Sequence, residues 1–366
     1  MTWLREIGRS KLKFGLLASA VGLLFFLLLF VNTLSSTLLG SFIGAIENSS
    51  ADALVFADDA QATIPASRLT PEDVDRVAAI EGVSAAAPIS ELTTDAVISG
   101  ESADVSLWGV EIGGPGTPAQ IDEGALPEAG QAIADSSARD AGVEVGSVIE
   151  VGGVPIEISG FAADATYSVL PTIYVDTATW GQVFSAVFPD APLTPINLVG
   201  VDIEDGSESE VLAAISALDG LEALTPSEAA AATPGVSSIQ QSFGLITGIT
   251  FVIVIVVVGF FFQILTVQKL KVFALLEALG SRLRALSGYV LAQIGFLVAI
   301  GVLVGTGLLA LTAYATRDVF AISVDPVLTA ILGGSILIAS LLSGLTSIRR
   351  IATQDAAGVS TGGETR

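Results

Sequence analysis

Cysteine and histidine are both absent from this chain of 366 residues, and methionine occurs only once. The chain therefore cannot form a disulfide framework, a cysteine zinc site, a histidine-based catalytic triad or a histidine-ligated metal centre. Charged residues are also scarce, at 14% against 51% hydrophobic residues, and the mean hydropathy is +0.73. This composition excludes an ordinary soluble enzyme and predicts that much of the apolar surface faces lipid.

Four stretches contain no charged side chain, and each is longer than the roughly 20 residues that a helix needs to cross a bilayer. They are residues 14–46, 229–268, 285–316 and 326–348. The transmembrane helices are expected at 14–38, 239–267, 285–312 and 326–348. Because no acidic or basic side chain lies within these spans, they are not expected to form a proton or ion pathway.

A cleaved signal peptide is the alternative for the first apolar stretch, because a basic segment precedes it. The apolar run is too long for a signal sequence. We therefore favour a transmembrane helix.

Lysine and arginine set the expected orientation, because they concentrate on the cytoplasmic side of membrane proteins. They cluster in the tails 1–13 and 349–366 and in the loop 268–284, whereas the loop 313–325 holds a single arginine. Both termini and the loop 268–284 are thus expected in the cytoplasm of a multi-pass plasma-membrane protein. The loop 313–325 and the large segment 39–238 are expected outside, in an extracellular or periplasmic space.

The large segment 39–238 contains 32 of the 38 acidic residues and only three basic ones. A solvated acidic surface explains most of this excess, and a site for a cation or a basic partner is the alternative. The acidic run 202–206 lacks the acidic ligand that a calcium loop needs six places after its glycine, because that position is Leu212. No metal site is expected.

The composition of the large segment predicts an α+β domain with βαβ-like ends. Strands are expected at 53–57, 83–89, 104–110 and 196–203. Helices are expected from Thr70 to about Gly82, with Thr70 as the N-cap and proline in the first turn, and from about Ser207 to Leu218.

Residues 113–176, between these ends, are rich in glycine and proline and are interpreted as an inserted small β subdomain. Short strands are expected at 147–151, 156–161 and 172–175, with a hairpin turn at Gly152-Gly153. An alanine-rich stretch then predicts a helical stalk that breaks at Pro234-Gly235 before the second span.

Sequence motifs for nucleotide hydrolysis and common hydrolytic chemistry are missing. The chain has no G-x-x-x-x-G-K-[ST] loop, no G-x-S-x-G elbow and no H-E-x-x-H pair. It is therefore not expected to hydrolyse ATP or to be an enzyme, and no nucleic-acid partner is expected.

The cytoplasmic loop 268–284 predicts a short amphipathic helix just inside the membrane. Apolar side chains recur at i, i+3, i+4 and i+7, and Gly280 is placed to end the helix. An anchor lying in the lipid interface is one interpretation. A docking helix for a cytoplasmic partner is the other.

This loop resembles the signature that follows the second span in FtsX/MacB-type ABC transporter permeases, where it forms the coupling helix seated on the ATPase. The positions that the resemblance assigns to ATPase coupling are Lys269, Lys271, Phe273, Leu276, Glu277, Gly280 and Arg282. The sequence departs from the signature at Val272, where the family usually has glutamate, and at Glu277, where it usually has a basic residue.

The resemblance extends over the whole chain. One span, a large outer domain and three further spans is the topology of these permeases, and the tail 349–357 resembles their closing motif with alanine in place of proline. It implies four transmembrane helices plus a MacB-like periplasmic core with a porter-like βαβ part. Residues 46–48, 53–56 and 67–69 further resemble the HrtB-type haem-exporting permeases.

The resemblance also implies partners. Two permease copies, in a homodimer or heterodimer, would sit in membrane lipid and bind two copies of a separate cytoplasmic ABC ATPase, which carries the ATP and Mg. No cofactor is expected on this chain. ATP would close the ATPase pair, and the long second span would carry that motion outward.

Small residues in the spans indicate where helices can approach closely. The candidates are Gly244 and Gly248 in the second span and Gly301 and Gly305 in the third. The alternative is simply a high glycine content, since the chain has 38 glycines.

The expected function is export of a hydrophobic or amphiphilic substrate. If the cargo is haem, its iron ligands must be tyrosine or carboxylate, and Glu47 and Tyr167 are the candidates; a surface glutamate and a packed tyrosine are the simpler interpretations. The alternatives are a non-transporting mechanotransmitter that regulates a cell-wall hydrolase and a lipoprotein-releasing permease. A membrane-anchored enzyme is the least favoured.

Overall fold

The computed structural model describes residues 11–191, 194–278, 283–316 and 326–342. The chain divides into two compact units. A helical unit comprises Met1–Ser35 and Ser242–Arg366, and an α+β domain comprises Ser36–Gln241. The two units are described separately below.

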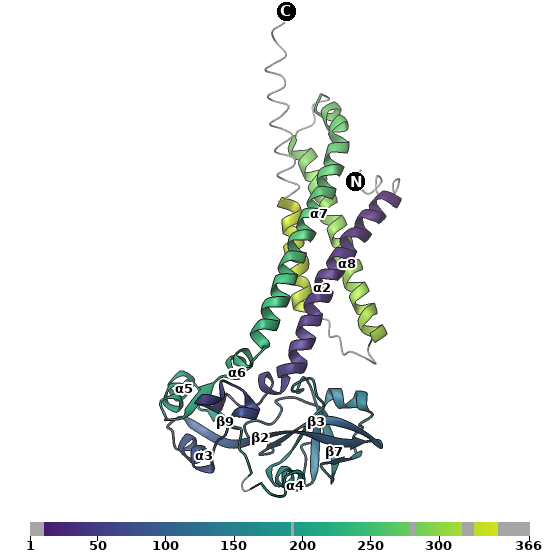
Figure 1. The fold of residues 1–366 in the computed structure, drawn as a ribbon. Helices are drawn as coiled ribbons and strands as arrows, with labels where there is room; N and C mark the ends of the chain where they lie inside the picture. The colour runs from purple at the N-terminus through teal and green to yellow at the C-terminus, as the bar shows by residue number, and fades with distance from the viewer. Residues whose placement is uncertain (1–10, 192–193, 279–282, 317–325, 343–366) are drawn as a thin grey trace, which may run out of the picture. The chain divides into compact units, whose positions relative to one another are not determined.

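Long apolar helices make up the helical unit (Figure 1). They are α2 (Lys11–Glu47), α7 (Val236–Ala278) and α8 (Leu283–Thr316), followed by a helix at Pro326–Leu342. Among the described residues, three segments are long and apolar enough to cross a membrane: Phe14–Glu47, Val236–Phe261 and Leu291–Thr316. Pro326–Leu342 is apolar but shorter. All four fall where spans are predicted, while the rest of the fourth predicted span and both ends of the chain lie outside the described residues.

Close helix packing joins α2 to α8 within the helical unit. A Cβ atom added to Gly301 would lie 2.5 Å from Val21, and one added to Gly305 would lie 2.7 Å from the carbonyl oxygen of Gly22. Phe25 and Val298 are fully buried in the same hydrophobic cluster. Glycine at these positions of α8 therefore allows the two backbones to approach.

The other predicted pair, Gly244 and Gly248 on α7, has no atom within 4 Å of an added Cβ among the described residues. These two glycines do not pack against another described helix of the same chain.

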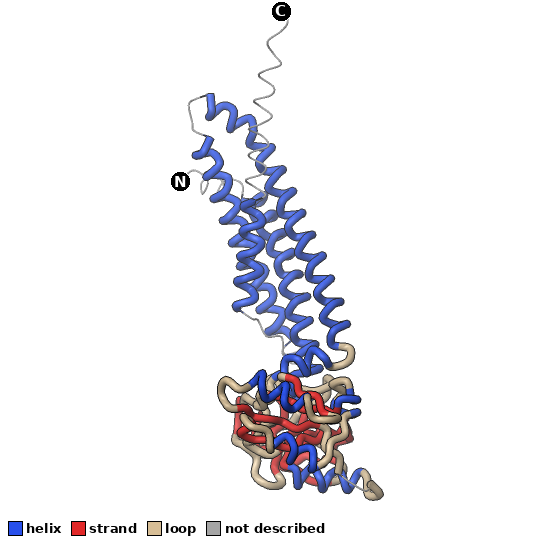
Figure 2. The backbone as a smooth tube through the Cα atoms, turned by 90° about the vertical axis from the view of Figure 1, so that its left-hand side faces the viewer, coloured by secondary structure: helices blue, strands red, loops and turns tan. Residues whose placement is uncertain are grey.

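The α+β domain contains ten strands, which Figure 2 shows in red. They are β1 (Ala53–Ala57), β2 (Val83–Ile98), β3 (Glu101–Val110), β4 (Ile121–Gly124), β5 (Gln131–Asp135), β6 (Val148–Val151), β7 (Val154–Ala162), β8 (Thr172–Asp176), β9 (Leu198–Ile203) and β10 (Leu221–Leu224). Its helices are α3 (Pro71–Ala78), α4 (Thr177–Val187), α5 (Glu208–Ser216) and α6 (Pro226–Ala232), with short 3-10 turns at Asp58–Ala60, Ile64–Ala66 and Ser136–Ala141.

One part of the domain is a four-stranded antiparallel sheet in the order β10-β1-β9-β2. The connections β1-α3-β2 and β9-α5-β10 each join parallel strands through a helix, which is the split βαβ arrangement. Val77 of α3 and Val211 of α5 pack in a cluster with Val55 of β1. The predicted βαβ ends of the domain are confirmed. Thr70 caps α3 in a capping box, although α3 ends at Ala78, earlier than expected.

The other part is a closed ring of six strands. The pairings run β2-β3-β8-β5-β7-β6 and return from β6 to β2, with β4 added to β7. Inward side chains from all six strands form one hydrophobic cluster, and α4 packs against it through Trp180 and Val183. The ring has no free edge except where β4 is added, as expected for a small barrel.

The barrel begins earlier in the chain than the predicted insertion at 113–176. Strand β2 has 16 residues and belongs to both parts: residues 83–89 pair with β9, and residues 90–98 pair with β3. Residues 90–98 include five polar side chains, so the sequence does not predict a strand there. The predicted hairpin is confirmed, since Gly152 and Gly153 both have positive φ between β6 and β7.

Candidate functional site at the end of α2

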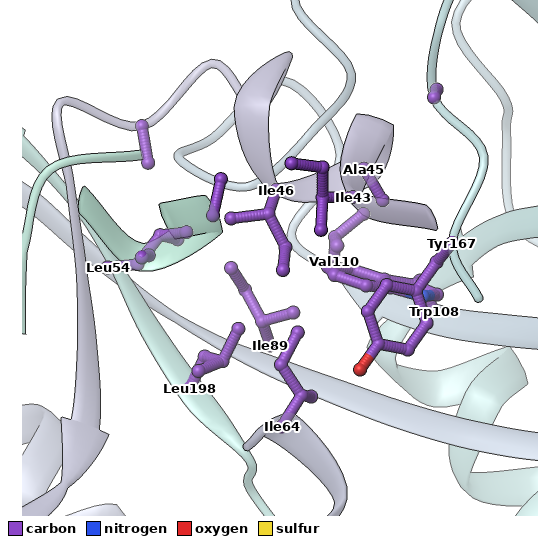
Figure 3. Close-up of a cluster of buried hydrophobic side chains, with 14 of the residues drawn as sticks. Ile43, Ala45, Ile46, Leu54, Ile64, Ile89, Trp108, Val110, Tyr167 and Leu198 are labelled. Carbon is purple, nitrogen blue, oxygen red and sulfur yellow. The ribbon is translucent and has the colours of Figure 1, made fainter. Parts of the chain in front are cut away.

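The last turns of α2 are buried in the core of the α+β domain. Ile43 and Ile46 are 1% and 0% exposed, and Figure 3 shows both side chains pointing into a cluster that includes Ile89. Ala229 of α6 and Val236, the first residue of α7, belong to the same cluster. The C-terminal end of α2 and the N-terminal end of α7 are therefore fixed in one hydrophobic core.

A loop at residues 163–172 pairs with the backbone of α2. The Ala45 N–H donates to the carbonyl oxygen of Thr166 at 2.9 Å, and the carbonyls of Ser41 and Phe42 accept from Val169 at 2.8 Å and Ser168 at 3.0 Å. In a regular helix the Ala45 N–H would donate to Ser41. The loop therefore replaces internal helix pairing with bonds between α2 and the domain.

Gly44 permits this close approach. A Cβ atom at this position would lie 2.5 Å from the carbonyl oxygen of Asp164 and 3.2 Å from that of Thr166. The Asn48 side-chain amide also donates to the Asp164 carbonyl, at 2.8 Å. Backbone atoms of the loop thus occupy the space that a larger side chain on α2 would need.

Asp135, at the end of β5, holds the same loop from the barrel side. It is 1% exposed, and its carboxylate accepts from the Thr166 hydroxyl and the Ser137 N–H, both at 2.8 Å, and from the Thr172 N–H. Burial raises the pKa of Asp135, and these hydrogen bonds oppose that rise. Tyr174 of β8 fixes the loop further, by donating to the carbonyl of Ala165 at 2.8 Å.

Tyr167 and Glu47, the two candidate haem ligands, occupy different environments. Tyr167 is 6% exposed, and its ring makes an edge-on contact with the ring of Trp108 at 5.4 Å between centroids. Figure 3 shows the two side chains beside each other. Burial, followed by the charge of Glu91, raises the pKa of the Tyr167 hydroxyl. Glu47 is exposed at the last residue of α2. Tyr167 thus packs in the core while Glu47 faces solvent.

Glu91 lies buried where β2 passes from the sheet to the barrel. Its carboxylate accepts from Thr93 at 3.1 Å and from Ser106 at 3.0 Å, and Ser106 in turn accepts from the Trp108 indole at 3.0 Å. The Glu91 N–H donates to the side chain of Asn197 at 2.8 Å. Burial raises the pKa of Glu91, and the two hydroxyl donors oppose the rise.

Glu91 should make stability depend on pH with a definite sign. Because its pKa is higher in the folded protein than the reference value of 4.5, its stabilising contribution is fully present below pH 4.5 and is lost as pH rises through the folded pKa. Each tenfold difference in proton affinity corresponds to about 1.4 kcal/mol. Thermal unfolding of the wild type and Glu91→Gln over a pH series should show the wild type losing stability relative to the variant as pH rises. A constant difference between them would contradict this assignment.

The predicted ATPase-coupling residues lie at the end of α7. Lys269, Lys271, Phe273, Leu276 and Glu277 belong to the helix, whose backbone continues without a break from Val236 to Ala278. The coupling segment is thus an extension of α7 up to that residue rather than a separate helix. The side chains of these five residues, and Gly280 and Arg282 entirely, lie outside the described residues.

The sequence alone does not predict a role for Gly44 or Asp135 in the functional site. Gly44 lies in an apolar helix that has other glycines, so nothing local distinguishes it. Asp135 precedes two serines after a buried strand, which is a signal for the helix cap it forms at Ser136–Ala141. That signal does not indicate its bonds to a loop some 30 residues later.

The fold and the apolar helices define a membrane protein with an extracytoplasmic α+β domain. Residues 16–218 match the MacB-like periplasmic core domain, and residues 244–356 match the FtsX-like permease C-terminal region. The chain therefore belongs to the FtsX/MacB family of ABC transporter permeases. Such permeases act with a cytoplasmic ATPase and are in general not themselves catalytic.

Relatives and solved structures resemble the chain at low identity. An uncharacterized ABC transporter permease of Mycobacterium tuberculosis, found in two strains, is 22% identical over 286 residues, which cover 78% of this chain and 77% of that protein. The extracellular domain of the noncanonical ABC-type transporter YknZ from Gram-positive bacteria is 14% identical, with a TM-score of 0.33 over 47% of this chain and 98% of that structure. The periplasmic region of MacB from Actinobacillus actinomycetemcomitans is 12% identical, with a TM-score of 0.35 over 54% of this chain and 92% of that structure.

Proposed function

We propose that this permease couples ATP hydrolysis by a separate ATPase to export of a hydrophobic or amphiphilic molecule, by transmitting motion through its helices to the outer domain. Two permease copies span the membrane four times each, with both termini in the cytoplasm. The residues at 269–282 bind the ATPase, and the acidic α+β domain lies outside.

The unbroken helix α7 is the observation that carries this proposal. Its 43 residues correspond to about 65 Å at 1.5 Å per residue, whereas the hydrocarbon core of a bilayer is about 30 Å thick. The helix thus runs without a break from the predicted coupling segment to Val236, which lies in the same core cluster as the end of α2. A push at the cytoplasmic end of α7 would reach the outer domain without a hinge in the helix.

The class of cargo follows from what the spans lack. A proton or ion pathway through the helices would need ionisable side chains there, and the four predicted spans have no acidic or basic residue. This favours a substrate taken from the membrane or its outer surface. Haem is one such amphiphile, with Glu47 as the accessible ligand, whereas Tyr167 could bind iron only if its buried side chain left the core.

ATPase activity of the permease with its co-purified ATPase in lipid nanodiscs tests the proposal. We expect a hydrophobic or amphiphilic compound, from a panel of haemin, lipids and antibiotics, to raise turnover severalfold. No stimulation by any compound would instead favour a mechanotransmitter with a protein partner.

Matched variants separate the haem hypothesis from the general one. Stimulation by haemin should fall in Glu47→Gln, and also in Tyr167→Phe if the tyrosine hydroxyl binds iron. The exposed Glu72→Gln on α3 serves as the control. Unchanged haemin stimulation in both candidate variants would exclude these two residues as ligands.

A further inference from the structure

Asp135 is a buried carboxylate without a cationic partner. Among the described residues, the ion pairs are Arg76 with Asp73 and Arg139 with Glu123, and neither includes Asp135. Burying an unpaired carboxylate is costly unless hydrogen bonds stabilise it. Three donors around Asp135 supply such bonds: Thr166 of the loop, Thr172 at the start of β8 and Ser137 after β5.

These hydrogen bonds form a continuous path from the barrel to α2. Thr166 donates its hydroxyl to Asp135, and its carbonyl accepts from the Ala45 N–H of α2. Thr172 donates its N–H to Asp135, and its hydroxyl accepts from the Tyr167 N–H at 2.8 Å. Tyr167 itself pairs with Ile43 of α2 in an isolated antiparallel bridge. Both paths from the carboxylate therefore end on the last turns of α2.

We propose that Asp135 is a positioning residue that latches the 163–172 loop to the barrel, so that movement of α2 is delivered to the barrel and not only to the sheet. This inference rests on the proposed function, because it requires α2 to move when ATP is bound or hydrolysed. Without the latch, β5 no longer follows the loop, which keeps its bonds to α2 and, through Tyr174, to β8. No other described carboxylate accepts hydrogen bonds from both Thr166 and Thr172.

Thr166 offers a mild way to open the latch. Thr166→Val keeps the shape of the side chain and removes the hydroxyl that reaches Asp135, while Thr166→Ser keeps the hydroxyl. The backbone carbonyl that binds Ala45 is present in both variants. Asp135→Asn removes the charge and is the stronger test where it folds.

Hydrogen–deuterium exchange on the permease–ATPase complex in nanodiscs, with and without ATP and vanadate, measures the transfer. In the wild type and Thr166→Ser, nucleotide should change exchange in peptides covering both 39–50 and the barrel strands β5 to β8. In Thr166→Val and Asp135→Asn, the change at 39–50 should persist and the change in peptides covering β5 should fall at least twofold. A merely structural role would lower stability without removing the nucleotide response of the barrel.

Two results would overturn the inference in different ways. A full response of β5 in both Thr166→Val and Asp135→Asn would show that the latch does not transmit motion, and would leave the proposed function standing. No nucleotide response at 39–50 in the wild type would remove the premise that α2 moves, and would overturn the latch together with the proposed function.

Discussion

Replacing Gly44 by valine is expected to destabilise the protein by about 3 kcal/mol, because the new side chain would overlap loop backbone that cannot rotate away. The Cβ alone would lie 2.5 Å from the Asp164 carbonyl oxygen. Relief of that overlap must separate α2 from the 163–172 loop, breaking the bonds from Ala45 and to Ser41 and Phe42. The thermal midpoint of the full chain, followed by tryptophan fluorescence, to which the buried Trp108 and Trp180 contribute, should fall.

Gly40 provides the matched control for Gly44, one helical turn earlier in α2. An added Cβ there has no atom within 4 Å among the described residues. Valine and glycine differ little in intrinsic helix propensity, so Gly40→Val should shift the midpoint slightly or not at all. Equal shifts in the two variants would mean that the loop does not constrain α2.

Replacing Gly305 by leucine should separate α8 from α2 within the helical unit. A Cβ at this position would lie 2.7 Å from the Gly22 carbonyl oxygen and 2.9 Å from the Phe26 backbone nitrogen. Overpacking of this kind costs about 2–3 kcal/mol, and the helix backbones must move to relieve it. The fraction of monodisperse protein that survives heating, measured by size-exclusion chromatography, should drop.

Gly307 lies two residues further along α8 and has no atom within 4 Å of an added Cβ among the described residues. Gly307→Leu adds the same apolar side chain to the same helix, so it should behave like the wild type in the heating assay. If Gly305→Leu is as heat-resistant as Gly307→Leu, then close α2–α8 packing does not hold the unit together.

Periodicity and charge predict the membrane helices because those signals are local. The length of a charge-free stretch predicts a membrane span, and the basic residues beside it predict which end of the span lies in the cytoplasm. Thr70 and the Gly152-Gly153 turn were likewise predictable, because a helix cap and a tight turn depend on neighbouring residues. The continuous apolar run at 53–57 likewise predicts the strand that the structure has there.

The barrel and the α2 junction depend on contacts between distant residues, which a single sequence does not reveal. The second half of β2, residues 90–98, has many polar side chains and pairs with β3 on one side and β6 on the other. Its strand conformation past residue 89 therefore depends on closure of the barrel, which the local sequence does not show. The role of Asp135 arises from a loop about 30 residues later, and that of Gly44 from a carbonyl 120 residues away. Tyr167 was selected for its chemistry, whereas its burial follows from the packing of Trp108.

The absence of native cysteine allows the central claim to be tested by spin labelling at single engineered positions. One label replaces Gln268 near the cytoplasmic end of α7, and another, in a separate variant, replaces Ser102 on β3; both positions are exposed. Distances between the equivalent labels of two permease copies are measured in nanodiscs with the ATPase, with and without trapped nucleotide. We predict that nucleotide shifts both distance distributions. A shift at position 268 with none at position 102 would contradict transmission of motion to the outer domain.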